Sequence, residues 1–130
     1  MLTRQNLFHA LAWVILVLFA IHIVAVGYDL YWRVLWLDHV THFLGGVFIA
    51  LLLLWLCFFS SYLKYSLPSR FKLFLLLVGG TLLVGIAWEI FEYSVGLTWS
   101  PKGYWSDTLY DLVFDTIGGL VAYLSVRHRL

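Results

Sequence analysis

Three pairs of ionisable residues, each three or four positions apart, stand where long apolar segments begin or end: Asp38 with His42, Glu89 with Glu92, and Asp111 with Asp115. Residues at these separations share one face of a helix. An ionisable side chain inside a membrane span costs roughly 2.5–3.5 kcal/mol, so it usually faces a partner or a wet cavity. Carboxylate and imidazole groups on facing helices are ligands for divalent metals such as zinc, manganese or iron. The spacing therefore favours a divalent metal site shared by several helices.

The predicted metal ligands are His42, Glu89, Glu92, Asp111 and Asp115. Glu89 and Asp115 are also the predicted catalytic residues, because carboxylates beside a metal can carry protons. Two further residues are expected to support this set: Asp38, which would orient His42, and His22, which would close the ring from the first apolar segment together with Asp29. The identity of the metal stays open, since no fixed motif such as His-Glu-x-x-His is present.

Several acidic and histidine residues of the chain also have interpretations that involve no functional site. Asp38 and Asp107 are residue types that cap helix N-termini, and Asp29 suits a solvated loop. His22 could be a neutral histidine bonded to a backbone carbonyl, and His39 could face lipid headgroups. The pairs named above could likewise form a purely structural polar network, since such networks hold membrane helices together.

Four long apolar segments must position these side chains. The chain has 130 residues, of which 63% are hydrophobic and only 12% charged. Each segment is close to the ~20 residues that a helix needs to cross ~30 Å of hydrocarbon. We therefore predict an all-α, four-helix transmembrane bundle that forms one integral membrane domain over residues 1–130, with helices at about 7–27, 38–59, 71–95 and 108–126. The first segment is too long for the core of a cleaved signal peptide and is expected to be retained.

The depths of the acidic residues agree between two of the predicted helices. A rise of 1.5 Å per residue places Glu89 about 9 Å inward from Val95, and Asp115 about 9 Å inward from Leu109. The last two helices can therefore present carboxylates to each other at one level of the membrane.

The basic residues predict the orientation. Six of the eight flank the two termini and the middle connection: Arg4, Lys64, Arg70, Lys72, Arg127 and Arg129. The excess of positive charge favours the cytoplasm for both termini and that connection. The acidic and histidine site then faces outward, in a multi-pass protein of the cell membrane. Trp99, Tyr104 and Trp105 belong to the last outer connection, where aromatic rings favour the headgroup layer, and are predicted to contact a lipid substrate.

A short internal repeat accompanies the polar pairs. Asp38-x3-His42-x2-Gly45-Gly46 parallels Asp111-x3-Asp115-x2-Gly118-Gly119. The repeat suggests two helical hairpins related by an axis along the membrane normal. Its glycine pairs fall one turn below the polar residues and would let neighbouring backbones approach closely there.

These motifs resemble those of the VanZ-like and YjdF-like small membrane proteins. The similarity covers about residues 37–119 and consists of Asp38-x3-His42, Trp88-Glu89-x2-Glu92 and Asp111-x3-Asp115-Thr-Ile-Gly118. It departs at His39, where lysine is usual, and at Asp115, where VanZ-like members tend to have asparagine. Some VanZ-like members are linked to glycopeptide-antibiotic resistance at the cell envelope. The resemblance implies the architecture and the positions of the site more than an activity.

Three functions are consistent with the sequence. The first is a metal-dependent enzyme that acts on an envelope lipid or a lipid-linked substrate from the outer leaflet. The second is a component of a proton- or cation-coupled transporter, and the third is a non-catalytic membrane assembly partner. The bilayer is an expected partner and a homo-oligomer is left open. Nucleic acid is not expected as a partner, because a net charge of +1 creates no field to attract it.

Overall fold

The computed structural model describes residues 2–60, 62–63, 65–66, 69–96 and 103–129 and is helical in all its regular elements. Four continuous helical stretches in this part of the chain are long and apolar enough to cross a membrane: Arg4–Gly27, Leu37–Phe59, Arg70–Val95 and Tyr104–Val126. The prediction of an all-α bundle with four spans is thereby confirmed. No strand occurs among the described residues.

The first span is α1 (Arg4–Gly27), and a short helix α2 (Leu30–Arg33) follows it. The second span consists of α3 (Leu37–Leu54) and a π-helical turn η1 (Trp55–Phe59). The third is built from α4 (Arg70–Phe74), a second π-helical turn η2 (Leu75–Gly79) and α5 (Gly80–Val95). The fourth is α6 (Tyr104–Val126).

Two spans begin earlier than the apolar pattern indicates. The Thr3 side chain accepts a hydrogen bond of 3.1 Å from the Asn6 backbone N–H, so α1 starts at Arg4. Helix α6 starts at Tyr104, after Gly103 with a positive φ of 86°. Asp107 therefore lies in the first turn of α6 and does not cap it, and Asp38 lies likewise within α3, whose N-cap is Trp36.

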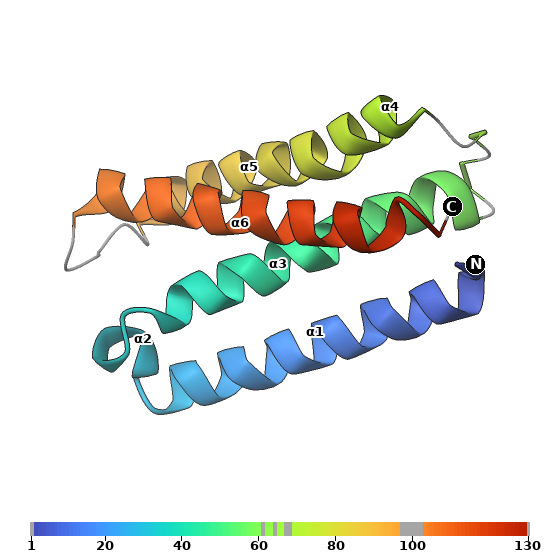
Figure 1. Cartoon of the computed structure of the whole chain (residues 1–130). Coiled ribbons are helices and arrows are strands. Elements are labelled where there is room, and N and C mark those ends of the chain that lie inside the picture. The colour runs from blue at the N-terminus through green and yellow to red at the C-terminus, as the bar shows by residue number, and fades with distance from the viewer. Residues whose placement is uncertain (1, 61, 64, 67–68, 97–102, 130) are drawn as a thin grey trace.

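Both termini lie at one end of the bundle, and α2 lies at the other (Figure 1). We call these the terminal end and the α2 end. Helices α3 and α6 form the most extensive contact in the described chain, and α5 packs against both of them. Since α3 and α6 both start at the α2 end, the two helices run parallel. The polar pairs that open them, Asp38 with His42 and Asp111 with Asp115, are thus brought to the same level.

The α3–α6 contact is a close approach of two backbones at glycines. A Cβ atom added to Gly46 would clash with the carbonyl oxygen of Asp115, and one added to Gly118 would clash with the carbonyl oxygen of Phe43. The contact is thus reciprocal. Asp115 lies three residues before Gly118, and Phe43 lies three residues before Gly46. The predicted close approach of backbones is confirmed at Gly46 and Gly118, whereas a Cβ atom on Gly45 would meet nothing within 4 Å and one on Gly119 would meet the Thr81 side chain.

The local symmetry of this contact pairs Gly46 with Gly118, one residue out of step with the sequence repeat, which aligns Gly45 with Gly118. The outer helices do not follow the symmetry. In the described residues, α5 contacts both α3 and α6, whereas α1 contacts α3 but not α6. The two hairpins are therefore related only through their inner helices.

The apolar core fills the terminal end of the bundle. Leu7 and Leu11 of α1 are buried there against Leu54, Leu77 and neighbouring side chains. The backbone N–H of Leu2 also donates a 3.1 Å hydrogen bond to the carbonyl of Arg129, which ties the start of α1 to the end of α6. Helix α1 is thus fixed at the terminal end, and its other end packs only against α2 and α3 in the part of the chain described.

Candidate functional site

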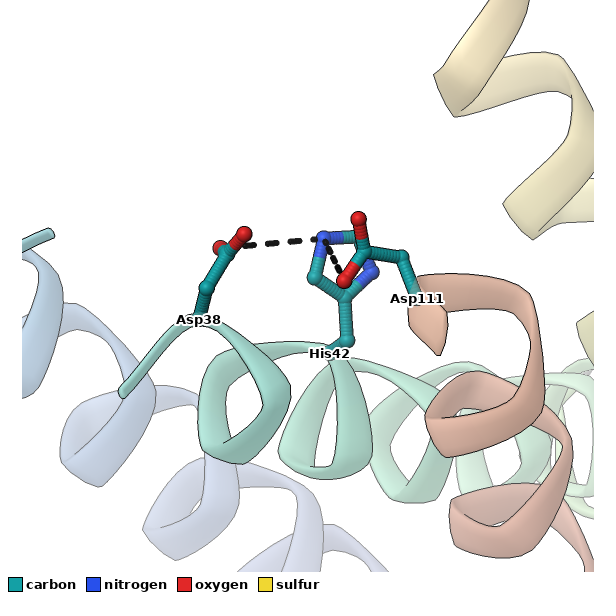
Figure 2. Close-up of side chains that lie close together, drawn as sticks. All are labelled: Asp38, His42 and Asp111. Atoms are coloured by element: carbon teal, nitrogen blue, oxygen red, sulfur yellow. Dashed lines mark ion pairs between the residues drawn. The ribbon is translucent and has the colours of Figure 1, made fainter. Parts of the chain in front are cut away.

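His42 stands at the centre of the polar cluster. Its Nε2 atom lies 3.9 Å from Oδ1 of Asp38 and 3.8 Å from Oδ1 of Asp111. Its Nδ1 atom, on the opposite side of the ring, lies 3.4 Å from Oδ1 of Asp115. Figure 2 shows Asp38 and Asp111 converging on the same edge of the imidazole from α3 and α6. One imidazole is therefore surrounded by three carboxylates from two helices.

Asp38, His42 and Asp111 offer one ligand atom each within 4.8 Å of one another, which is a geometry that could hold a metal ion. Asp111 is only 3% exposed, and its Oδ1 atom accepts no hydrogen bond from the residues that the structure describes. A buried carboxylate oxygen without a hydrogen bond is costly and calls for an explanation, such as an ion. The predicted convergence of His42 and Asp111 is found, and Asp38 joins them directly.

Asp115 fits between the helices because glycines of α3 and α5 lie against it. It is 7% exposed, and a Cβ atom on Gly85 of α5 would lie 2.5 Å from its Oδ2. Gly46 of α3 lies against its backbone carbonyl. Asp115 thus sits in the three-helix contact and faces the far nitrogen of His42. In metal sites a ligating histidine usually donates its other N–H to a carboxylate, which fixes the tautomer and the ring orientation.

Glu89 is buried between α5 and α6, at 5% exposure. Its Oε2 atom accepts a 2.7 Å hydrogen bond from the hydroxyl of Thr108, and its Oε1 atom has no hydrogen-bond partner among the described residues. Glu89 is not part of the group of three ligands that the structure brings together. Its predicted roles as a metal ligand and catalytic residue remain predictions.

We expect Thr108→Val to lower the free energy of unfolding by about 1–3 kcal/mol, because the buried Glu89 carboxylate loses the hydrogen bond to its Oε2. Thr116→Val is the matched control, since the Thr116 hydroxyl donates only to the Leu112 carbonyl of its own helix. Unfolding of both variants can be measured in detergent micelles. Equal losses of stability would show that the Thr108–Glu89 bond contributes nothing specific.

Glu92 and Asp107 lie at the α2 end of a cavity between α1, α3 and α5. This cavity has a volume of about 740 Å³ and also reaches Asp38, His42 and Asp115. Ligand pockets of proteins commonly measure 300–1,000 Å³. The predicted role of Glu92 as a metal ligand is not tested, but its position on the cavity wall is compatible with contact to a bound molecule.

His22 lines the same cavity as the cluster. Its Nδ1 atom lies 2.9 Å from the hydroxyl of Tyr31, and both residues line the cavity. Burial raises the pKa of Tyr31 above its ordinary value, a hydrogen bond with Thr41 opposes this, and the nearby Asp38 carboxylate adds to the rise. The partner of His22 is thus a side chain rather than a backbone carbonyl. Asp29 ends up outside the ring, in a turn with a left-handed φ of 54°.

His39 differs from the expectation that it faces headgroups. Its side chain is 13% exposed, its Nδ1 lies 3.5 Å from Oδ1 of Asp111, and its ring stacks on Phe114 with centroids 4.8 Å apart. His39 is therefore a neighbour of the cluster that the sequence analysis missed. Its position next to Asp38 and three residues before His42 was the available signal.

Trp99 lies outside the described residues. Tyr104 contacts Tyr93 and Trp105 with ring centroids 5.5 and 5.1 Å apart, and Trp105 is 80% exposed. Neither Tyr104 nor Trp105 lines the cavity. Their contact with a lipid substrate stays a prediction.

Comparison with known proteins gives a family for the whole chain. The family described as "Predicted membrane protein (DUF2238)" matches residues 2–130. The chain belongs to this family. No curated protein and no solved structure matches it. Membership in DUF2238 and the four apolar spans together establish a multi-pass membrane protein. The resemblance to the VanZ-like and YjdF-like proteins remains a prediction.

Proposed function

We propose that this protein is a metal-dependent membrane enzyme that acts on a lipid or a lipid-linked substrate. The observation that supports this best is the junction of two features: Asp38, His42 and Asp111 converge beside a largely apolar cavity that reaches the first two of them. The convergent group can hold a metal ion, and the cavity can take an apolar chain. Reactive groups and a hydrocarbon-compatible pocket are thus adjacent.

A divalent metal held there would supply a Lewis acid for a phosphate or carboxylic ester. Hydrolysis of such an ester forms one bond from a water oxygen to phosphorus or carbon, breaks the bond to the leaving alcohol, and returns one proton to that alcohol. Asp115 and Glu89 are the carboxylates that could hold this proton. The first faces His42 at 3.4 Å, and the second has an oxygen without a hydrogen-bond partner in the described residues.

Orientation and location are part of the proposal. The positive residues favour a cytoplasmic terminal end, so the cluster at the α2 end would serve the outer leaflet of the cell membrane. A proton- or cation-coupled pathway has less support. Beyond the cavity the described helices pack as an apolar core that includes Leu54, Leu77 and Tyr123, and no acidic, basic or histidine side chain belongs to this described core.

The proposal is tested with the purified, detergent-solubilised protein. Elemental analysis should find about one divalent ion per chain, as expected for a ligand set of this kind. The protein should then release headgroup or fatty acid from vesicles of phosphatidylethanolamine and phosphatidylglycerol. A chelator should stop this turnover, and one added metal should restore it. Metal at blank level together with no product from either lipid would overturn the proposal.

A further inference from the structure

The cavity has the depth of one membrane leaflet. Its lining residues run from Ile15 to Val26 on α1, from Asp38 to Ile49 on α3, and from Thr81 to Glu92 on α5. Each stretch covers eleven residue steps (26 − 15, 49 − 38 and 92 − 81), or about 16 Å of helix. Half of the ~30 Å hydrocarbon thickness of a bilayer is about 15 Å. The cavity thus extends from the polar cluster to about the middle of the membrane.

The side of the cavity between α1 and α5 faces the bilayer. Both helices line the cavity, yet their backbones make no close contact in the described part of the chain. Helix α1 is held by the core around Leu7 and the Leu2–Arg129 hydrogen bond at the terminal end and by α2 and α3 along its length, and none of these contacts closes its side toward α5. A lipid can therefore reach the cavity sideways from its own leaflet, without leaving hydrocarbon.

Carboxyl groups outnumber basic side chains on the described lining, where the basic residues are His22 and His42. The carboxylates gather at the α2 end, where Asp38, Glu92, Asp107 and Asp115 line the cavity, and no lysine or arginine is among the described lining residues. The deeper lining is mostly apolar and includes Phe19, Phe48 and Ile49, beside Thr81. This distribution complements a molecule with a cationic head and a hydrocarbon tail.

We propose that the cavity binds one acyl chain of an aminophospholipid of the phosphatidylethanolamine class, with the ammonium group beside Glu92 and Asp107. A depth of about 16 Å accommodates about 13 bonds of extended chain, at about 1.2 Å a bond. This length suits the acyl chain of a leaflet lipid and is too short for a long polyprenyl chain. That the bound lipid is also a substrate rests on the proposed function. Binding of the lipid can be tested without any turnover.

The experiment uses phosphatidylethanolamine with a photoactivatable diazirine near the end of one acyl chain, in vesicles that contain the full chain washed with chelator. After illumination, crosslinked peptides are mapped by mass spectrometry. Crosslinks are expected at the deep, partly buried lining residues Phe48 and Ile49, several-fold above those at the exposed, non-lining Leu83 and Trp13. A uniform spread over all lipid-facing residues would overturn the proposal.

Two glycines supply a matched pair of variants. A Cβ atom on Gly45 or on Gly79 meets nothing within 4 Å, but only Gly45 lines the cavity. Gly45→Phe should lower deep crosslinking at least about fivefold by filling the cavity, and Gly79→Phe should leave it unchanged. Thermal unfolding of both variants checks that they fold. A folded Gly45→Phe protein with full deep crosslinking would contradict the assignment of the cavity to the chain.

The headgroup is tested with a second probe. Phosphatidylglycerol with the same diazirine chain lacks the ammonium group and should crosslink several-fold less. Glu92→Gln combined with Asp107→Asn should remove this difference, because the two carboxylates proposed to face the ammonium group are gone. Both residues lie outside the candidate metal group. Equal labelling by the two lipids in the unmodified protein would overturn the aminophospholipid assignment. Because the protein is metal-free here, a failed lipid result and a failed metal result can be told apart.

Discussion

Asp111→Asn is expected to remove stoichiometric metal from the purified protein and to abolish metal-dependent turnover. Asparagine keeps the shape of the side chain but loses the charge that would face the ion beside His42 and Asp38. Metal affinity should fall by more than about 100-fold, because 10–100-fold is the usual cost of losing an outer-shell partner and a ligand costs more. The measurement is metal titration of the chelator-washed protein, followed by elemental analysis.

Asp115→Asn should have a smaller effect of a different kind. Asp115 faces the Nδ1 side of His42, away from Asp38 and Asp111, so we expect it to orient the imidazole. Its loss should weaken metal binding by about 10–100-fold without abolishing it.

Asp29→Asn is the control for both variants. It makes the same chemical change in an exposed turn with a φ of 54°, a conformation that asparagine tolerates. Its metal content should equal that of the unmodified protein. Asp111→Asn protein that is folded and retains a full complement of metal would exclude Asp111 as a ligand.

Gly46→Ala should destabilise the protein strongly, and Gly45→Ala should not. The new methyl group at Gly46 would overlap the carbonyl oxygen of Asp115, whereas the same group at Gly45 enters open space. Overpacking of this kind costs about 1–3 kcal/mol, and a helical glycine replaced by alanine otherwise gains about 0.5–1 kcal/mol. Because the gain from alanine applies at both positions, the two variants should differ by about 1–3 kcal/mol in the free energy of unfolding.

This difference can be measured by reversible unfolding in mixed micelles. Because Gly46 lies against Asp115, the Gly46→Ala protein should also lose metal affinity in proportion to any separation of α3 and α6. Two glycine variants of equal stability would mean that the backbones of α3 and α6 can move apart at no cost, and that their contact does not position the site.

Local spacing in the sequence was sufficient to predict the centre of the cluster. Asp38 with His42, and Asp111 with Asp115, share helix faces by their four-residue separation, and the glycines that follow them bring those faces together. The number of spans followed from composition alone, since each apolar run has the length of a bilayer crossing.

Other features depend on tertiary geometry that no local pattern encodes. The turn to which Asp29 belongs rotates it out of the ring, and the hydroxyl of Thr108 reaches Glu89 only because α5 and α6 pack at one particular register. The three-residue spacing of His39 and His42 places both on one face of α3, but that both reach Asp111 depends on how α6 packs against that face. The cavity could not be predicted either, since α1 is apolar on all sides and its sequence does not specify a tilt.

Helix α1 lies at the edge of the bundle, in contact with α2, α3 and η1 but not with α5 or α6, and this has a mechanical consequence. A helix at the edge can tilt under lateral pressure, and the α3–α6 contact at Gly46 and Gly118 does not involve α1 and would be undisturbed by such a movement. Thickness and chain packing of the surrounding bilayer act directly on this helix. The width of the cavity beside His42 therefore depends on the membrane as well as on the protein. It should change with membrane composition even when every side chain of the cluster stays in place.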